Sequence, residues 1–203
     1  MGELKIADFP INSSHEPAPQ CAVYIREVGR IKSRFLAHDL SSGLPPPQTL
    51  SLQEGQTYAE NRDPTFEIKR RSVIGRSFTA YETGMSEPAA QMDCATWSLG
   101  HWIITFPGNS LIHNLDMRPA GNQARADIFV VESIPFFWEP QGNGAVRKLW
   151  KAVNGERIEV GELQSRTSRD THGLLKIDTA HVDRLVGIMT SIALLKRLES
   201  FRK

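Results

Sequence analysis

Apolar and polar residues alternate through the middle of this chain, and the alternation predicts β-strands. The segments 65–69 and 77–82 carry apolar side chains at every second position, which is typical of a strand with one buried face. Glycine and proline residues interrupt the pattern at short intervals and supply the turns. We expect further strands at 21–25, 95–99, 102–106 and 128–132.

The segment 134–160 predicts a meander of antiparallel strands. The aromatic run Phe136-Phe137-Trp138 leads into a turn at 141–144, and the segment 146–153 then runs back. Asn154-Gly155 begins another hairpin, because both central residues of a type I′ turn need positive φ. Short strands at this spacing, with no helix between them, predict an antiparallel sandwich or barrel.

The pattern changes near the C-terminus, where we expect an apolar helix. Asp178 can cap a helix over residues 179–199. Between Leu185 and Leu195 the helix has almost no polar face, since the only interruptions are Gly187, Thr190 and Ser191. A helix that is apolar on all sides either spans a membrane or is enclosed by protein. This stretch falls well short of the roughly 20 residues that a membrane span needs. We therefore predict a mainly β protein in which a closed antiparallel barrel encloses the helix.

The chain is expected to form one domain over residues 21–203. Residues 1–20 include several prolines and few consecutive apolar residues, so we expect a flexible N-terminal tail. A long loop is expected near 41–56, where three prolines at 45–47 favour extended backbone. The segment before this loop is too short for a core of its own, so the loop belongs within the domain.

Composition narrows the class of protein. The 203 residues include 24 basic and 23 acidic side chains, and this near balance argues against a protein that coats nucleic acid. Cys21 and Cys94 are too few for a disulfide framework and do not form a zinc-binding pair, so we expect no metal or other cofactor. The N-terminus has no hydrophobic leader, and we expect an intracellular, cytoplasmic protein without a transmembrane segment.

Several short motifs between Phe66 and Leu198 occur in an order that is more specific than any one of them. They are Phe66-Glu67-Ile68-Lys69, Ala95-Thr96-Trp97, Arg125 with Ile128-Phe129-Val130-Val131, Phe137-Trp138-Glu139, Lys148-Leu149-Trp150-Lys151, Gly173-Leu174-Leu175-Lys176-Ile177 and the final apolar helix. In this order the chain resembles the Tubby C-terminal-like superfamily, which includes Tubby domains, LURP-one-related proteins and phospholipid scramblases. It looks most similar to fungal members of unknown function.

The resemblance implies a closed barrel of about twelve antiparallel strands, threaded by the C-terminal helix. It also implies a binding protein rather than an enzyme, because Tubby domains bind phosphoinositide headgroups and most members bind rather than catalyse. Anionic membrane lipid is then the expected partner, with the protein peripheral at a membrane. Scramblases carry a cysteine-rich palmitoylation stretch that this chain lacks, so we do not expect lipid scrambling.

Basic residues form the candidate site for an anionic headgroup, because guanidinium and ammonium groups bind phosphate through charge-assisted hydrogen bonds. The candidates are Lys69, Arg70, Arg71, Arg76, Arg147 and Lys151. The first four surround a predicted turn. Arg147 and Lys151 are expected to face solvent, with Trp150 of the same strand facing the core.

Two other functions stay open on the sequence. One is a protein-interaction or regulatory module without lipid affinity, which would use loops such as 41–56. The other is an enzyme. It is disfavoured because Gly75-Arg76-Ser77-Phe78 lacks the second glycine of a nucleophile elbow and no other catalytic motif stands out.

Overall fold

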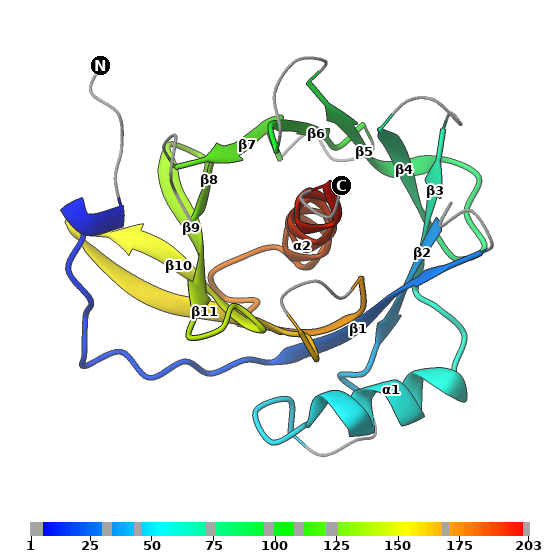
Figure 1. Ribbon diagram of the computed structural model, residues 1–203, viewed down its shortest axis with the longest axis horizontal. Coiled ribbons are helices and arrows are strands. Elements are labelled where there is room, and N and C mark those ends of the chain that lie inside the picture. Colours follow the sequence, from blue (N-terminus) through cyan, green and yellow to red (C-terminus); the bar gives the residue numbers. More distant parts are fainter. Residues whose placement is uncertain are drawn as a thin grey trace.

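The protein is a closed β-barrel with one helix inside it (Figure 1). The computed structural model describes residues 6–29, 34–42, 46–71, 76–95, 100–107, 112–120, 126–167 and 171–200, with side chains as far as Arg197. The strands are β1 (Cys21–Val28), β2 (Arg34–Asp39), β3 (Phe66–Arg70), β4 (Ser77–Glu82), β5 (Pro88–Cys94), β6 (Trp102–Thr105), β7 (Leu115–Pro119), β8 (Asp127–Val131), β9 (Ile134–Gln141), β10 (Val146–Val153), β11 (Glu156–Gln164) and β12 (Gly173–Ile177). The helices are η1 (Ile6–Asp8), α1 (Leu52–Glu60) and α2 (Arg184–Ser200).

Each strand pairs antiparallel with its neighbours in the chain, and β12 pairs with β1 to close the ring. Closure removes the open sheet edges that would otherwise be free to pair with another chain. The Asn154-Gly155 turn has positive φ at both residues, 53° and 80°, as a type I′ hairpin requires. The predicted fold class, a closed antiparallel barrel around an apolar C-terminal helix, is therefore confirmed.

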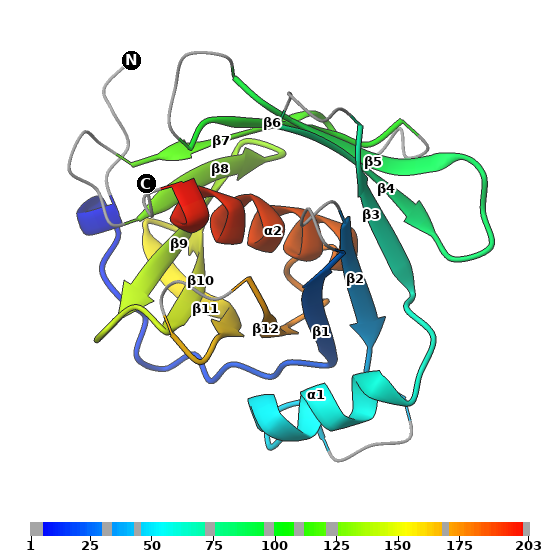
Figure 2. The ribbon, with the colours of Figure 1, turned by 45° about the vertical axis from the view of Figure 1, so that its right-hand side comes forward.

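Helix α2 runs through the barrel, and its whole middle section is buried (Figure 2). Every residue from Val186 to Leu195 is buried, including the polar Thr190 and Ser191. Gly187 lets the helix approach β12 closely, because a Cβ there would lie 3.1 Å from Ile177 Cδ1. None of the described helices is long and apolar enough to cross a membrane.

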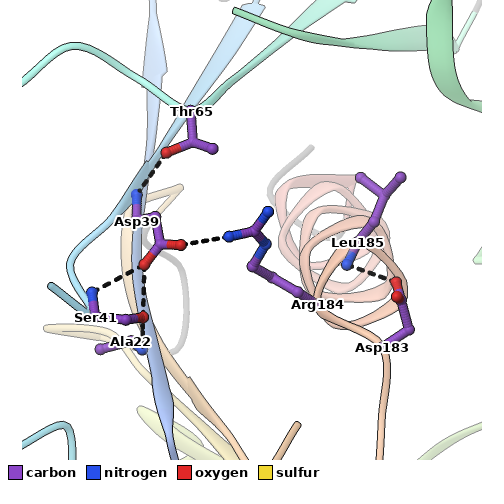
Figure 3. Close-up of polar contacts among 7 residues, drawn as sticks. All are labelled: Ala22, Asp39, Ser41, Thr65, Asp183, Arg184 and Leu185. Carbon is purple, nitrogen blue, oxygen red and sulfur yellow. Dashed lines mark hydrogen bonds and ion pairs between the residues drawn. The ribbon is translucent and has the colours of Figure 1, made fainter.

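The first turn of α2 is anchored by two aspartates (Figure 3). Asp183 Oδ1 accepts hydrogen bonds from the amides of Leu185 and Val186 at 2.8 and 3.1 Å, so it is the N-terminal cap. The predicted cap, Asp178, is wrong: its carboxylate instead accepts from Ala180 and holds a separate turn. Arg184 reaches across to β2, where its Nη1 lies 2.5 Å from Asp39 Oδ2.

Part of the predicted loop near 41–56 is helical. Helix α1 begins after Ser51, which forms a capping box with Glu54, and it packs outside the barrel on β1 and β12. Residues 43–45 lie outside the described part of the chain.

The N-terminal segment, predicted to be a flexible tail, lies along the outside of the barrel from residue 6 onward. Ile11 forms a parallel bridge with Arg157 of β11. The ring of Phe9 packs 5.6 Å from that of Phe137. These contacts attach the segment to the outer surface of β9, β10 and β11.

Four strands were not predicted from the sequence: β2, β5, β7 and β12. β5 and β7 each contain a proline at one end but alternate apolar and polar residues over 90–94 and 115–119, whereas β2 and β12 show no clean alternation. The predicted strand 95–99 lies outside the described residues except for Ala95, which follows β5. The alternation in β5 and β7 is a strand signal, whereas β2 and β12 complete the barrel through pairing that their own patterns do not indicate.

Candidate functional site

The antiparallel order of the strands gives the barrel two chemically different ends. The β3–β4 and β9–β10 connections lie at the end where α2 finishes, and the β4–β5, β8–β9 and β10–β11 connections lie at the end where α2 begins. We call the first the basic end and the second the acidic end. The exposed acidic residues of the acidic end are Glu60, Asp63, Glu82, Glu87, Glu132, Glu156 and Asp183.

Four of the predicted site residues come together at the basic end, where β3 meets β4. Lys69, Arg71 and Arg76 are exposed, and Arg70 is half-buried on the inner face of β3, which it shares with Phe66 and Ile68. The residues between Arg71 and Arg76 lie outside the described part of the chain. Three exposed cations within one strand connection make a compact positive surface.

Acidic neighbours partly neutralise this surface. Lys69 Nζ lies 2.9 Å from Glu67 Oε2, and Arg34 Nη1 lies 2.7 Å from the other carboxylate oxygen. These hydrogen bonds, that of Lys69 first, hold the pKa of Glu67 below its usual value, so this carboxylate stays charged. Arg71 lies 4.0 Å from Asp93, a distance at which an exposed pair contributes little. Arg71 Nη1 also donates to Gln91 Oε1 at 3.4 Å, and its guanidinium stays exposed to solvent.

Arg147 and Lys151 do not join this surface, and the prediction that they face solvent is wrong. Both lie on β10, five strands from β3 around the ring, and both point into the barrel. Lys151 Nζ donates to the carbonyl of His181 at 3.3 Å and lies 5.8 Å from the ring of Phe136, a core residue. Arg147 is only 4 % exposed.

Trp150 has the opposite orientation to the one predicted. It faces outward and packs with Ile128 and Phe137 beneath the N-terminal segment. The guanidinium of Arg157 covers it at 4.9 Å from the ring centre. An outward tryptophan is compatible with burial here only because residues 6–12 cover it.

Two open depressions lie on the outer surface. One, of about 620 Å³, crosses β2, β3 and β4 and is lined by Arg34, Glu67, Lys69, Tyr81 and Met85. Lys69 Nζ lies 5.6 Å from the ring centre of Tyr81, so this depression combines a cation with aromatic and apolar surface. The other, of about 680 Å³, lies beside β7 and β8 and includes Arg118, Val130 and Glu132.

Metal-binding side chains do not gather anywhere in the described part of the chain: no group of three or more His, Cys, Asp or Glu residues is placed to hold an ion. Burial raises the pKa of the Cys21 thiol, which keeps it protonated and unreactive at neutral pH.

Comparisons with known protein families, with curated proteins and with solved structures found no match.

Proposed function

We propose that this protein is a non-enzymatic, Tubby-like domain that binds phosphoinositide or other anionic lipid headgroups at a membrane surface. The site is the basic end of the barrel, with Lys69, Arg70, Arg71 and Arg76 as the residues that contact the headgroup. The observation that carries the proposal is the gathering of three exposed cations at the β3–β4 connection. Guanidinium groups in such a cluster suit the phosphate oxygens of a headgroup.

The unequal charge of the two ends supports the same orientation at a membrane. Anionic lipid attracts nearby basic residues by about 1 kcal/mol each. The exposed carboxylates of the acidic end would be repelled by the same surface. A barrel that approaches with its basic end first satisfies both preferences, and the proposal therefore includes a cytoplasmic location, where the anionic leaflet lies.

The resemblance to Tubby-like proteins is part of this proposal. A barrel of twelve strands that encloses its C-terminal helix is the architecture that the resemblance implies. Fold alone does not specify a ligand, so the lipid assignment depends on the basic cluster.

A second candidate function is a protein-interaction module. It is favoured by exposed apolar side chains beside the two depressions, Met85 at 64 % and Val130 at 39 % exposure. Vesicle binding separates the two functions: a lipid-binding domain sediments with anionic vesicles in a salt-dependent manner, whereas an interaction module does not.

A further inference from the structure

The N-terminal segment binds the outside of the barrel as an added strand binds a sheet edge (Figure 1). In the part of the chain that the structure describes, β12 pairs with β11 only from Gly161 onward, which leaves the edge at the start of β11 to another segment. Residues 10–12 take this place. The Arg157 amide donates to the carbonyl of Pro10 at 2.8 Å, and the Asn12 amide donates to the carbonyl of Arg157 at 3.0 Å. Main-chain bonds of this kind are how an extended peptide adds to a sheet.

An apolar patch lies beside this edge on the outer surface of β8, β9 and β10. Its members are Ile128, Phe137, Trp150 and Ala152. Ile6 and Phe9 of the N-terminal segment pack on the patch, and the ring of Phe9 lies 5.6 Å from that of Phe137. We call the patch and the adjoining edge of β11 at Arg157 the docking face.

The docking face is buried, but the segment that covers it is not. The four patch residues are at most 8 % exposed, whereas none of the residues 6–20 is buried, and Ile11 is 53 % exposed. A pocket of about 160 Å³ also lies between Pro17 and Pro19 of the segment and strands β11 and β12. A segment without buried side chains separates from a folded domain at low cost. The barrel itself is closed by pairing of β1 with β12, so it does not depend on residues 6–20.

We propose that the docking face is a peptide-binding site that residues 6–12 occupy in cis, and that an extended partner segment of the same chemistry takes their place. The cis segment shows which chemistry fits: an aromatic residue, then proline, then a β-branched residue, as in Phe9-Pro10-Ile11. The aromatic ring packs on the patch. Proline suits the next position because only its carbonyl is used, and a β-branched residue favours the extended backbone.

A partner is needed because the uncovered docking face would expose a contiguous apolar patch, which favours its replacement by another apolar segment. The docking face lies on β8–β11 and the basic cluster lies on β3 and β4, so this inference does not depend on the proposed headgroup site.

The test measures binding of a fluorescein-labelled peptide, with the sequence of residues 6–16, to the full chain by fluorescence anisotropy. In the wild type the cis segment competes at an effective concentration of roughly millimolar. Phe9→Ala in the protein weakens the cis segment and leaves the docking face intact, so the peptide should bind about tenfold more tightly than to the wild type. Ile103→Ala, which truncates an exposed apolar residue on β6, is the matched control and should bind like the wild type. Equal binding to the wild type and Phe9→Ala, or no binding to either, overturns the proposal.

Two changes locate the bound peptide. Ala152→Glu, added to the Phe9→Ala protein, places a carboxylate on the patch, so we expect binding to be lost. A peptide that itself carries Phe9→Ala lacks the aromatic anchor and should bind about tenfold more weakly. Peptide binding that neither change reduces contradicts the docking face as the site.

Hydrogen exchange of the Arg157 amide supplies a measurement that does not depend on the Phe9 variant. This amide is bonded to the Pro10 carbonyl, so its exchange reports whether the segment is in place. Asn12→Pro removes the N–H that the segment donates to Arg157, and the Arg157 amide should then exchange faster. Added peptide should restore its protection. Unchanged exchange in Asn12→Pro would mean that the segment is a fixed part of the barrel, and it would overturn the proposal.

Gel filtration with light scattering distinguishes a partner peptide from a second copy of the chain. We expect the wild type to be a monomer with its own segment in place. A concentration-dependent dimer that the free peptide dissociates would assign the docking face to exchange of N-terminal segments between two copies, and it would overturn a partner peptide as the occupant.

Discussion

The indole nitrogen of Trp138 donates a hydrogen bond to the hydroxyl of Thr190 across 3.2 Å, in the centre of the barrel. Both residues are fully buried, and the Thr190 hydroxyl in turn donates to the carbonyl of Val186 one turn earlier in α2. This bond ties the enclosed helix to β9. It also explains why the most apolar segment of the chain contains a threonine.

Replacing Thr190 with valine should destabilise the protein although the two side chains are almost equal in size. The change leaves the Trp138 N–H buried without an acceptor, which costs about 1–3 kcal/mol. Urea denaturation measures the free energy of unfolding. Thr190→Ser is the control, because it keeps the hydroxyl and removes only a methyl group; if it is more damaging than Thr190→Val, the hydrogen bond has little importance.

Met189→Asp should abolish the fold. Met189 is fully buried on α2, and an unpaired carboxylate there costs several kcal/mol against a total stability of about 5–15 kcal/mol. Circular dichroism and gel filtration should show an unfolded or aggregated chain, whereas Met189→Leu should remain folded. A well-folded Met189→Asp protein with a normal melting transition would refute the enclosed helix.

Asp127 should make stability depend on pH in the acidic range. Burial raises the pKa of this carboxyl from 3.8 to about 6, against the opposing effect of Arg197. Because the folded state then binds the proton more tightly than the unfolded state, Asp127 contributes most stability below about pH 4. That contribution is lost as the pH rises to about 6.

The measurement for Asp127 is the difference in unfolding free energy between the wild type and Asp127→Asn at several pH values. Between about pH 4 and 6, the free energy of unfolding of the wild type should fall relative to that of Asp127→Asn, by an amount on the order of 3 kcal/mol. Burial is the main cause of a lowered pKa for His38, but this residue is present in both proteins, so its contribution cancels in the difference. A constant difference across this range contradicts the raised pKa.

Two substitutions in the turn between β8 and β9 should stabilise the protein. Glu132 and Ser133 have positive φ, 50° and 67°, although neither residue favours that conformation. The double change Glu132→Asn/Ser133→Gly installs the preferred type I′ sequence and should add about 1 kcal/mol of stability. Gly155→Ala in the β10–β11 turn is a control with the opposite expected effect. Residue 155 has a φ of 80°, which alanine rarely adopts, so this change should destabilise the protein. Equal melting temperatures for all three proteins would contradict the reasoning.

The sequence predicted the barrel because a helix that is apolar on every side has few physical solutions. The orientation of β10 could not be predicted, since both of its faces contain apolar and basic residues. The inner face carries Arg147, Leu149, Lys151 and Val153, and the outer face carries Val146, Lys148, Trp150 and Ala152. A strand with no polar face gives no signal for which face is turned toward the core. The burial of Trp150 on the outer face depends on the N-terminal segment, more than a hundred residues away in the chain.

The residues of the predicted site also differ in whether local sequence was enough to place them. Lys69, Arg70, Arg71 and Arg76 flank one turn, so local sequence was enough to bring them together. Arg147 meets Asp127 and Arg197 only through the closed ring and the enclosed helix. Helix α1 was predictable from the Ser51–Glu54 capping box, a signal masked by the prolines before it.

Vesicle co-sedimentation with charge-matched variants tests the proposed membrane function most directly. Arg71→Gln/Arg76→Gln removes two charges from the β3–β4 cluster, and Arg62→Gln/Lys151→Gln removes two charges away from the basic end. We expect the wild type and the second variant to sediment with phosphoinositide vesicles at low salt and to dissociate at high salt. The first variant should bind about thirtyfold more weakly, at about 1 kcal/mol for each charge removed. Equal binding by the two variants, or no binding by the folded wild type, would contradict the account.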